Sequence, residues 1–217
     1  MRLELRLAVR ERARFLSHLE MVDVLLAALR RAGFEVALSQ GMRPKPVISL
    51  ALARGVGVAS EDEHLAVELV GGEHDPDDVL ARLAATCPRG VVPLSCAVAG
   101  PKADVEGATY RLDFAAPAAL VTAACASYRS ADELIVERSS PKGRRRIDVR
   151  RFAPDPVCED GAVHVRIAIL EDGSAKPDEV ARALDQRADG GLGRAAITRL
   201  AVHTAPRGAR VGAVETP

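Results

Sequence analysis

Aromatic side chains are scarce in this sequence, which contains no tryptophan and only 3% aromatic residues. Its core must therefore be built mainly from aliphatic side chains. Hydrophobic residues make up 48% of the 217 residues, with a mean hydropathy of +0.03, and this composition excludes an intrinsically disordered chain. The length allows one large domain or two small domains of about 100 residues each.

Net charge is lacking as well, because 30 basic and 30 acidic residues cancel. No field of the whole protein therefore attracts it to nucleic acid or to a membrane. No apolar run reaches the roughly 18 residues that span a bilayer, and the charged N-terminal segment has no signal-peptide core. We expect a soluble, cytoplasmic protein in which any basic binding surface is local.

The sequence also lacks metal-binding cysteine motifs and the common catalytic motifs. Cys87, Cys96, Cys125 and Cys158 form no C-x-x-C pair and lie at no finger-like spacing from histidine. A zinc ribbon and a disulfide framework are therefore not expected. We expect four buried free thiols instead. The sequence has no P-loop, dinucleotide fingerprint, G-x-S-x-G or H-E-x-x-H motif. We assign it no metal and no cofactor of its own.

Periodicity predicts a β-α-β-β-α-β order in the first half of the chain. Residues 2–9 alternate between polar and apolar, which is typical of a strand. Ser17 and Glu20 form a capping box that begins a helix, and Gly33 ends it. A second helix, over 75–87, begins with Asp75 as its cap and Pro76 in its first turn. Further strands are predicted at 35–38, 47–52, 63–70 and 91–99.

The second half repeats this order of elements. Helices are predicted at 117–128 and 176–184, and strands at 108–115, 133–138, 145–152, 162–170 and 195–203. The sequence therefore predicts an α+β protein of two tandem ferredoxin-like (split βαβ) domains with antiparallel sheets. The predicted domains cover 1–100 and 107–205, joined near 100–107 and followed by a flexible tail over 206–217.

The loop "SQGMRPKPVIS" over 39–49 is the first candidate surface. Pro44 and Pro46 restrict the backbone and favour extended conformations at Arg43 and Lys45. A stiff loop that holds two cations loses little ordering entropy when it contacts a phosphate. The alternative is a crossover loop whose prolines block strand pairing and whose cations are solvated.

The segment "PKGRRRIDVRRF" over 141–152 is the second candidate surface, and the strongest local excess of positive charge. On a strand, Arg144, Arg146, Asp148 and Arg150 would share one face, with Lys142 just before them. Such a row of cations can follow a phosphate backbone, or it can protect an edge strand. Aromatic residues for stacking bases are scarce there; Phe114 and Phe152 are the candidates, and either can belong to the core instead.

His18 is the one candidate for acid–base chemistry. It would lie in the first turn of the helix that begins after Ser17, where unpaired N–H groups attract anions. A catalytic role would require a pocket that also holds Ser39 and Gln40. The one neighbouring carboxylate, Glu20, is already used in the capping box.

The segments "ARFLSHLE" and "LRRAGFEVALSQGMRPKPVISLALARGVGVASEDEHL" together resemble the uncharacterised radical-SAM-associated domain family. Its pattern reads F-S-H-L-D, R-R-A-G, S-Q-G-F-x-P-x-P-x-I-S and G-V-x-S-x-x-E, which covers residues 1–70; "RRIDVR" and "AAITRL" are similar to later parts. The chain departs from this pattern at three places: Glu20 replaces the usual Asp, Asp23 stands where an Arg is common, and Met42-Arg43 replaces the usual Phe-Asn. A role that depends on that helix arginine is therefore not expected here. The matching residues are Phe15, Ser17, His18, Ser39, Gln40, Gly41, Pro44, Pro46, Ser49, Ser60, Glu63, Asp148 and Arg150.

The resemblance implies a partner radical-SAM protein with a cobalamin-type module. The chain lacks the C-x-x-x-C-x-x-C triplet of such enzymes, so the iron–sulfur cluster, S-adenosylmethionine and cobalamin are expected in the partner. We therefore expect a non-enzymatic accessory module that binds RNA and presents it to the partner. The expected basic surface joins the loop over 39–49 to the arginine-rich strand in one groove. Two alternatives remain, a protein-docking domain without nucleic-acid binding and a small-ligand enzyme that uses His18.

Overall fold

The alternation of apolar residues in the N-terminal strand sets the layers of the fold. In the computed structural model, which describes residues 1–140 and 143–206, Leu3, Leu5 and Leu7 of β1 (Arg2–Val9) are buried. The intervening Glu4 and Arg6 are exposed on the other side of the strand. The same alternation in the neighbouring strands gives a sheet with one apolar face and one polar face.

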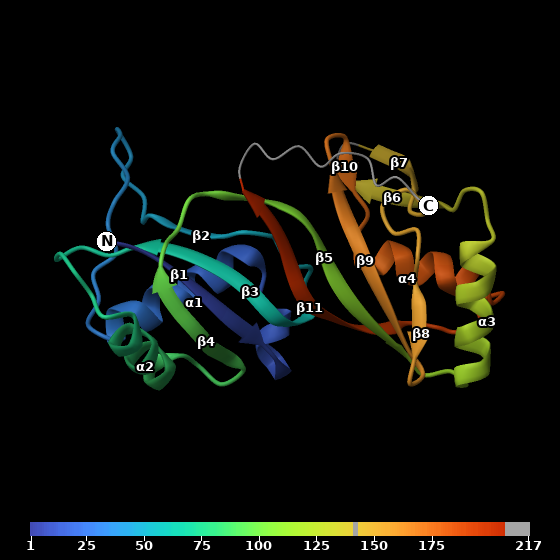
Figure 1. Ribbon diagram of the computed structural model, residues 1–217, viewed down its shortest axis with the longest axis horizontal. Helices are drawn as coiled ribbons and strands as arrows, with labels where there is room; N and C mark the ends of the chain where they lie inside the picture. Colours follow the sequence, from blue (N-terminus) through green and yellow to red (C-terminus); the bar gives the residue numbers. More distant parts are fainter. Residues whose placement is uncertain (141–142, 207–217) are drawn as a thin grey trace.

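This sheet is continuous through both halves of the chain (Figure 1). Its path runs β10-β9-β5-β11-β3-β1-β4, with β2 also paired to β3 and β8 to β9. β11 lies parallel to β3, and the other pairs are antiparallel. The remaining strands of this sheet are β2 (Ile48–Leu50), β3 (Ala59–Glu68), β4 (Val91–Val98), β5 (Ala103–Phe114), β8 (Val157–Glu159), β9 (Ala162–Leu170), β10 (Gly173–Ser174) and β11 (Ala195–Pro206).

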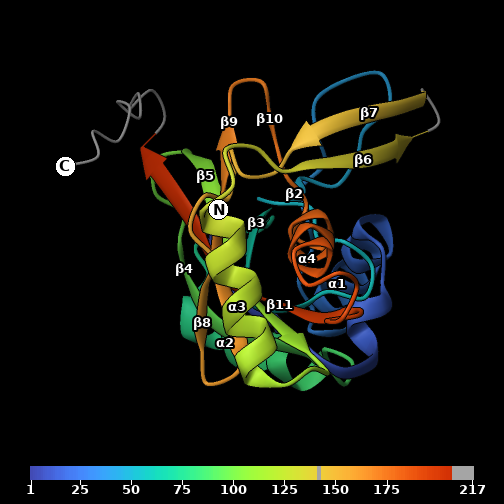
Figure 2. The same ribbon diagram turned by 90° about the vertical axis from the view of Figure 1, so that its right-hand side faces the viewer.

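Four α-helices cover the apolar face and leave the polar face open (Figure 2). They are α1 (His18–Arg31), α2 (Pro76–Thr86), α3 (Ala118–Arg129) and α4 (Pro177–Gln186), and a short 3-10 helix η1 (Glu11–Phe15) precedes α1. One core joins β1 and β3 to α1 and α2. A second joins β5 and β9 to α3 and α4. None of the helices in the described ranges is long and apolar enough to cross a membrane.

The predicted helix starts are confirmed. The backbone N–H of Ser17 donates to Oε2 of Glu20 at 2.8 Å, and the backbone N–H of Glu20 donates to Oγ of Ser17 at 3.4 Å, which together form the expected capping box. Asp75 caps α2 by accepting from the backbone N–H of Asp77, with Pro76 in the first turn. These local signals are strong because each one satisfies N–H groups that the first turn leaves unpaired.

The α+β class and the mostly antiparallel sheet are confirmed, but several predicted strands are wrong. The predicted strand at 35–38 is reduced to isolated bridges at Val36 and Leu38. Residues 103–107, predicted to be a linker, form the start of β5. The strands predicted at 133–138 and 145–152 lie outside the main sheet and form a separate hairpin of β6 (Ile135–Ser140) and β7 (Gly143–Asp148). The predicted tail falls, beyond residue 206, outside the described residues.

Candidate functional site

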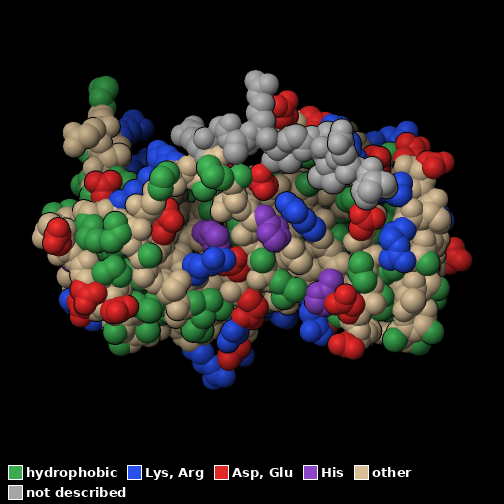
Figure 3. Space-filling model, in the orientation of Figure 1, with side chains coloured by type: hydrophobic (Ala, Val, Ile, Leu, Met, Phe, Trp, Pro, Cys, Tyr) green, Lys and Arg blue, Asp and Glu red, His purple; other side chains and the backbone are tan. Residues whose placement is uncertain are grey.

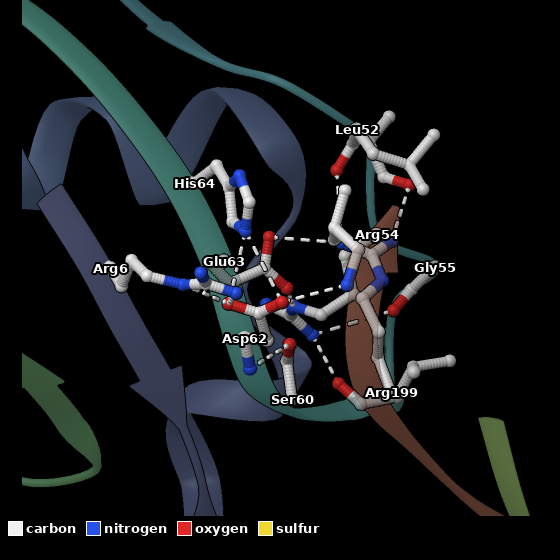
Figure 4. A network of polar contacts seen from close by, with 12 residues as sticks. Arg6, Leu52, Arg54, Gly55, Ser60, Asp62, Glu63, His64 and Arg199 are labelled. Atoms are coloured by element: carbon white, nitrogen blue, oxygen red, sulfur yellow. Dashed lines mark hydrogen bonds and ion pairs between the residues drawn. The ribbon is translucent and has the colours of Figure 1, made fainter. Parts of the chain in front are cut away.

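A cluster of buried charged side chains lies where the two apolar cores meet (Figure 4). Arg199 of β11 is 1% exposed and donates from Nη1 to Oε2 of Glu63 at 3.1 Å. It also donates to the backbone carbonyls of Leu52, at 3.1 Å, and of Ala53, at 3.0 Å. These bonds join β11 to β3 and to the segment that follows β2.

Arg54 belongs to the same cluster and acts as a clamp on the backbone. Its Nε lies 3.4 Å from Oε1 of Glu63. Its Nη1 donates to the carbonyl oxygen of Arg14 at 2.7 Å and to that of Val58, and its Nη2 donates to that of Leu16 at 3.3 Å. One side chain therefore holds the end of η1, the start of α1 and the loop over 52–58 together.

The cluster carries more positive than negative charge, since two guanidinium groups share one carboxylate. Burial raises the pKa of Glu63, and the guanidinium groups of Arg199 and Arg54 oppose this effect. Within the described residues, Nε of Arg199 is buried and has no hydrogen-bond partner. Unpaired buried donors are rare in protein interiors and require an explanation. Here the unmatched cation lies beside a cleft.

This cleft has a volume of about 1210 Å³ and lies where the two halves meet. One wall consists of residues from η1 and from the loop over 52–58, and the other of residues from the start of α4 and the turn before β11. Arg199, together with Arg54, contributes to its buried floor. Seven of the lining side chains are cationic, namely Arg14, Arg54, Arg138, Lys176, Arg182, Arg194 and Arg199.

Two acidic side chains line the cleft, Asp178 and Asp185, and both have partners. Oδ1 of Asp185 accepts from the backbone N–H groups of Leu192, at 3.0 Å, and Gly193, at 2.9 Å. Asp178 lies 3.8 Å from Arg182 in an exposed pair. The cleft therefore has a net positive charge, and its chemistry favours an anionic ligand.

Arg138 of β6 is neutralised by Glu179 of α4. Its Nε and Nη2 donate to the two carboxylate oxygens of Glu179, both at 2.6 Å, and Nη2 also donates to the carbonyl of Ser174 at 2.8 Å. Burial raises the pKa of Glu179, but the hydrogen bonds from Arg138 and from the backbone N–H of Lys176 outweigh it, so the pKa is lowered. This pair fixes the β6–β7 hairpin to the start of α4.

A second polar cluster lies on the open face of the sheet, behind the first. Asp62 is 4% exposed and accepts from Nε of Arg6 at 2.7 Å and from the backbone N–H of Val202 at 2.7 Å. Nε2 of His64 lies 3.1 Å from Oδ1 of Asp62. Burial raises the pKa of Asp62, and these hydrogen bonds and charges outweigh it, so the pKa is lowered. Asp62 therefore holds β11 against β3 from the opposite side.

The predicted loop over 39–49 borders a hollow of about 900 Å³ on this open face. Ser39, Lys45, Pro46 and Ser49 line it, whereas Arg43 does not. Oγ of Ser39 accepts from the backbone N–H of Lys45 at 3.0 Å, which closes the loop on itself. Figure 3 shows basic, acidic and histidine side chains mixed on this face, in contrast to the cationic cleft.

The predicted arginine ladder is shorter than expected. β7 ends at Asp148, whose Oδ1 accepts from the backbone N–H groups of Leu134, at 2.9 Å, and Arg150, at 3.1 Å. Nη2 of Arg150 donates to the carbonyl of Arg129 at 2.7 Å. Arg144 lies 3.3 Å from Glu137 in an exposed pair, Arg146 is exposed, and Lys142 lies outside the described residues.

The two predicted cationic segments do not form one groove, and that expectation is wrong. In Figure 1 the loop lies near the N-terminus, whereas β6 and β7 lie at the other end of the long axis. The cleft between the halves contains Arg138 but neither Arg43 nor Lys45, and the open-face hollow contains no residue of β7. The two segments were linked by charge alone, and charge does not specify distance.

His18 and the cysteines provide no arranged reactive site. His18 begins α1 and lines neither hollow, and of the expected trio only Ser39 borders the hollow on the open face. Cys125 is buried, but Cys87, Cys96 and Cys158 are only half-buried. Burial raises the pKa of the Cys87, Cys96 and Cys125 thiols to about 11. They are therefore protonated, weak nucleophiles at neutral pH.

The chain matches a family model described as "Uncharacterized protein conserved in bacteria (DUF2344)" over residues 2–192. This match includes the first half, the second half up to the turn before β11, and therefore most of the cleft, but not Arg194 or Arg199. No curated protein matches the chain. The extent of the match shows that the chain belongs to this uncharacterised bacterial family.

Proposed function

We propose that the chain is a non-enzymatic accessory module that binds RNA in the cleft between its halves. The observation that carries this proposal is the excess of positive charge in the lining. Arg14, Lys176 and Arg194 form no ion pair with a described residue, and Arg54 and Arg199 share the single carboxylate of Glu63. Phosphate groups are the natural counterpart, because each neutralised phosphate releases counterions and adds to the affinity. Arg194 is exposed and forms no ion pair with any described residue, so it is available to such a ligand.

The size of the cleft favours an extended ligand over a small one. Its volume of about 1210 Å³ is above the roughly 300–1,000 Å³ of typical small-molecule pockets. The exposed cations Lys176, Arg182 and Arg194 are spread along α4 and the turn before β11. A phosphate backbone that follows this wall could contact several of them in succession.

We further propose that the partner is a radical-SAM enzyme, which would hold the iron–sulfur cluster, S-adenosylmethionine and cobalamin. The resemblance of residues 1–70 to the radical-SAM-associated pattern supports this. The edge strand β4 offers a surface for docking, since Val92, Leu94 and Val98 are 37%, 46% and 59% exposed. Docking through β4 without RNA binding is the second candidate function.

The strand order supports the proposal that the two halves are ferredoxin-like repeats. In each half, the strand before the first helix lies centrally, as the order β4-β1-β3-β2 and the order β11-β5-β9-β8 show. This order agrees with that of a split βαβ unit, which supports the proposal for both halves. The β6–β7 hairpin is an addition to the second unit.

Neutralising the exposed cations of the cleft is expected to lower the affinity for single-stranded RNA. It should also reduce the dependence of that affinity on salt concentration. The triple variant Lys176→Gln, Arg182→Gln, Arg194→Gln removes three potential phosphate contacts. The slope of log Kd against log salt concentration should fall by about 2. Fluorescence anisotropy of a labelled RNA, titrated between 50 and 300 mM salt (about a sixfold range), measures this slope.

The matched control is Arg144→Gln, Arg145→Gln, Arg146→Gln, which removes the same charge from the exposed β6–β7 hairpin. We expect it to leave the slope nearly unchanged. Loss of the slope in the hairpin variant, but not in the cleft variant, would move the RNA site to the hairpin. Absence of RNA binding by the unaltered protein at low salt would favour the docking function.

A further inference from the structure

One aromatic side chain of the six is exposed, and it lies in the cleft. The six aromatic residues, four Phe and two Tyr, all fall within the described ranges. Phe15 is 55% exposed, whereas Phe34, Tyr110, Phe114, Tyr128 and Phe152 are at most 8% exposed. Phe114 and Phe152, the stacking candidates from the sequence, are therefore core residues. Phe15 instead lines the cationic cleft.

The backbone on both sides of Phe15 is held in place. The guanidinium group of Arg54 donates hydrogen bonds to the carbonyl oxygens of Arg14 and Leu16, the residues before and after Phe15. The backbone N–H of Gly57 also donates to the carbonyl of Arg14 at 2.8 Å. An aromatic ring on a fixed backbone loses little conformational entropy when a ligand packs against it.

The surroundings of the ring combine flat apolar contact with positive charge. Cζ of Arg14 lies 4.9 Å from the centroid of the Phe15 ring, in cation–π contact. Gly57 lies against the ring edge, where an added Cβ would be 3.7 Å from Cε1 of Phe15. Lys176 and Arg182 of the opposite wall line the same cleft. This combination of an aromatic platform and a cationic groove is how proteins bind single-stranded nucleic acid.

We propose that Phe15 stacks against a base of single-stranded RNA whose phosphates lie along the cations of the cleft. This inference rests on the proposed function and adds to it a base contact at a defined position. Apolar packing of a protein side chain on Phe15 is the competing possibility, but the cationic lining favours a polyanion that also carries planar groups. Recognition would be independent of sequence, because every base has a π-face.

The test compares a ten-nucleotide RNA with inorganic polyphosphate of similar charge, which has no bases. Phe15→Ala should weaken RNA binding by about 5- to 150-fold and leave polyphosphate binding unchanged. Leu19→Ala is the matched control, because Leu19 is 74% exposed on α1 and lines neither hollow. Its affinity for RNA should equal that of the unaltered protein.

Phe15→Trp gives a second, independent measurement, because the chain otherwise contains no tryptophan. Its affinity for RNA should be retained, and its fluorescence should be quenched by RNA but not by polyphosphate. Equal RNA affinity of Phe15→Ala and the unaltered protein, or equal loss with RNA and polyphosphate, would overturn the stacking role while RNA binding stands. Failure of the unaltered protein to bind either probe would overturn the proposed function itself.

Discussion

Replacement of Arg199 by methionine is expected to lower the free energy of unfolding by about 3–5 kcal/mol, as is typical when one partner of a buried ion pair is removed. The side chain is 1% exposed and donates to Glu63 and to the carbonyls of Leu52 and Ala53. Methionine fills a similar space but donates no hydrogen bond, so the carbonyls of Leu52 and Ala53 lose a donor and Glu63 keeps only Arg54 as its cationic partner. Urea unfolding followed by circular dichroism measures the loss.

The control for this substitution is Arg111→Met on the open face. Arg111 pairs with Asp113 at 2.8 Å, with both side chains more than 40% exposed. Its replacement should cost less than about 1 kcal/mol, as is usual for exposed pairs. An equally small cost for Arg199→Met would show that the buried cluster contributes little to the joining of the halves.

The coupling of Arg199 to Glu63 can be isolated with a double-mutant cycle. Glu63→Gln removes the carboxylate charge that two guanidinium groups share. If the pair acts as a unit, the double variant should lose less stability than the sum of the two single variants. Additive losses would indicate that the carbonyl bonds of Arg199, and not Glu63, are what β11 depends on.

Local signals in the sequence predicted the local structure well. Ser17 with Glu20, and Asp75 with Pro76, fix helix starts within a few residues, where no distant contact can override them. The β6–β7 hairpin shows what local patterns do not specify, namely which strands pair with one another. Val136 and Ile147 have the burial pattern of sheet strands, but they pair only with each other because β8 takes the place beside β9.

The candidate site could not be derived in the same way, because its parts are distant in the sequence. Glu63 matched the family pattern, but its partner Arg199 lies 136 residues away. Local charge density pointed to the hairpin arginines, which are solvated or bonded to nearby groups. The cations of the cleft are scattered singly from Arg14 to Arg199 and become a cluster only through the pairing of β11 with β3. The scarcity of aromatics is what could have singled out Phe15.

Replacement of Arg138 by methionine is expected to lower the free energy of unfolding by about 3 kcal/mol at pH 7. The substitution leaves Glu179, which is 1% exposed, with the backbone N–H of Lys176 as its remaining donor at 2.8 Å. Arg151→Met serves as the control, because Arg151 pairs with Asp172 on the surface and both side chains are about half exposed. That control should cost less than about 1 kcal/mol.

The pH dependence separates this ion pair from mere packing. Because the pKa of Glu179 is lowered in the folded protein, the pair contributes its full stability above the unfolded value of about 4.3 and loses it as the pH falls further. In the variant, burial without Arg138 raises the pKa of Glu179, so its carboxylate is protonated before that of the unaltered protein. The difference in stability between the unaltered protein and Arg138→Met should therefore narrow as the pH falls from 7 toward 3. Urea midpoints across this range give the difference directly. A gap that does not change with pH would mean that Arg138 stabilises the hairpin through the Ser174 carbonyl and its aliphatic stem, and that the charge of Glu179 has no part in fixing the wall of the cleft.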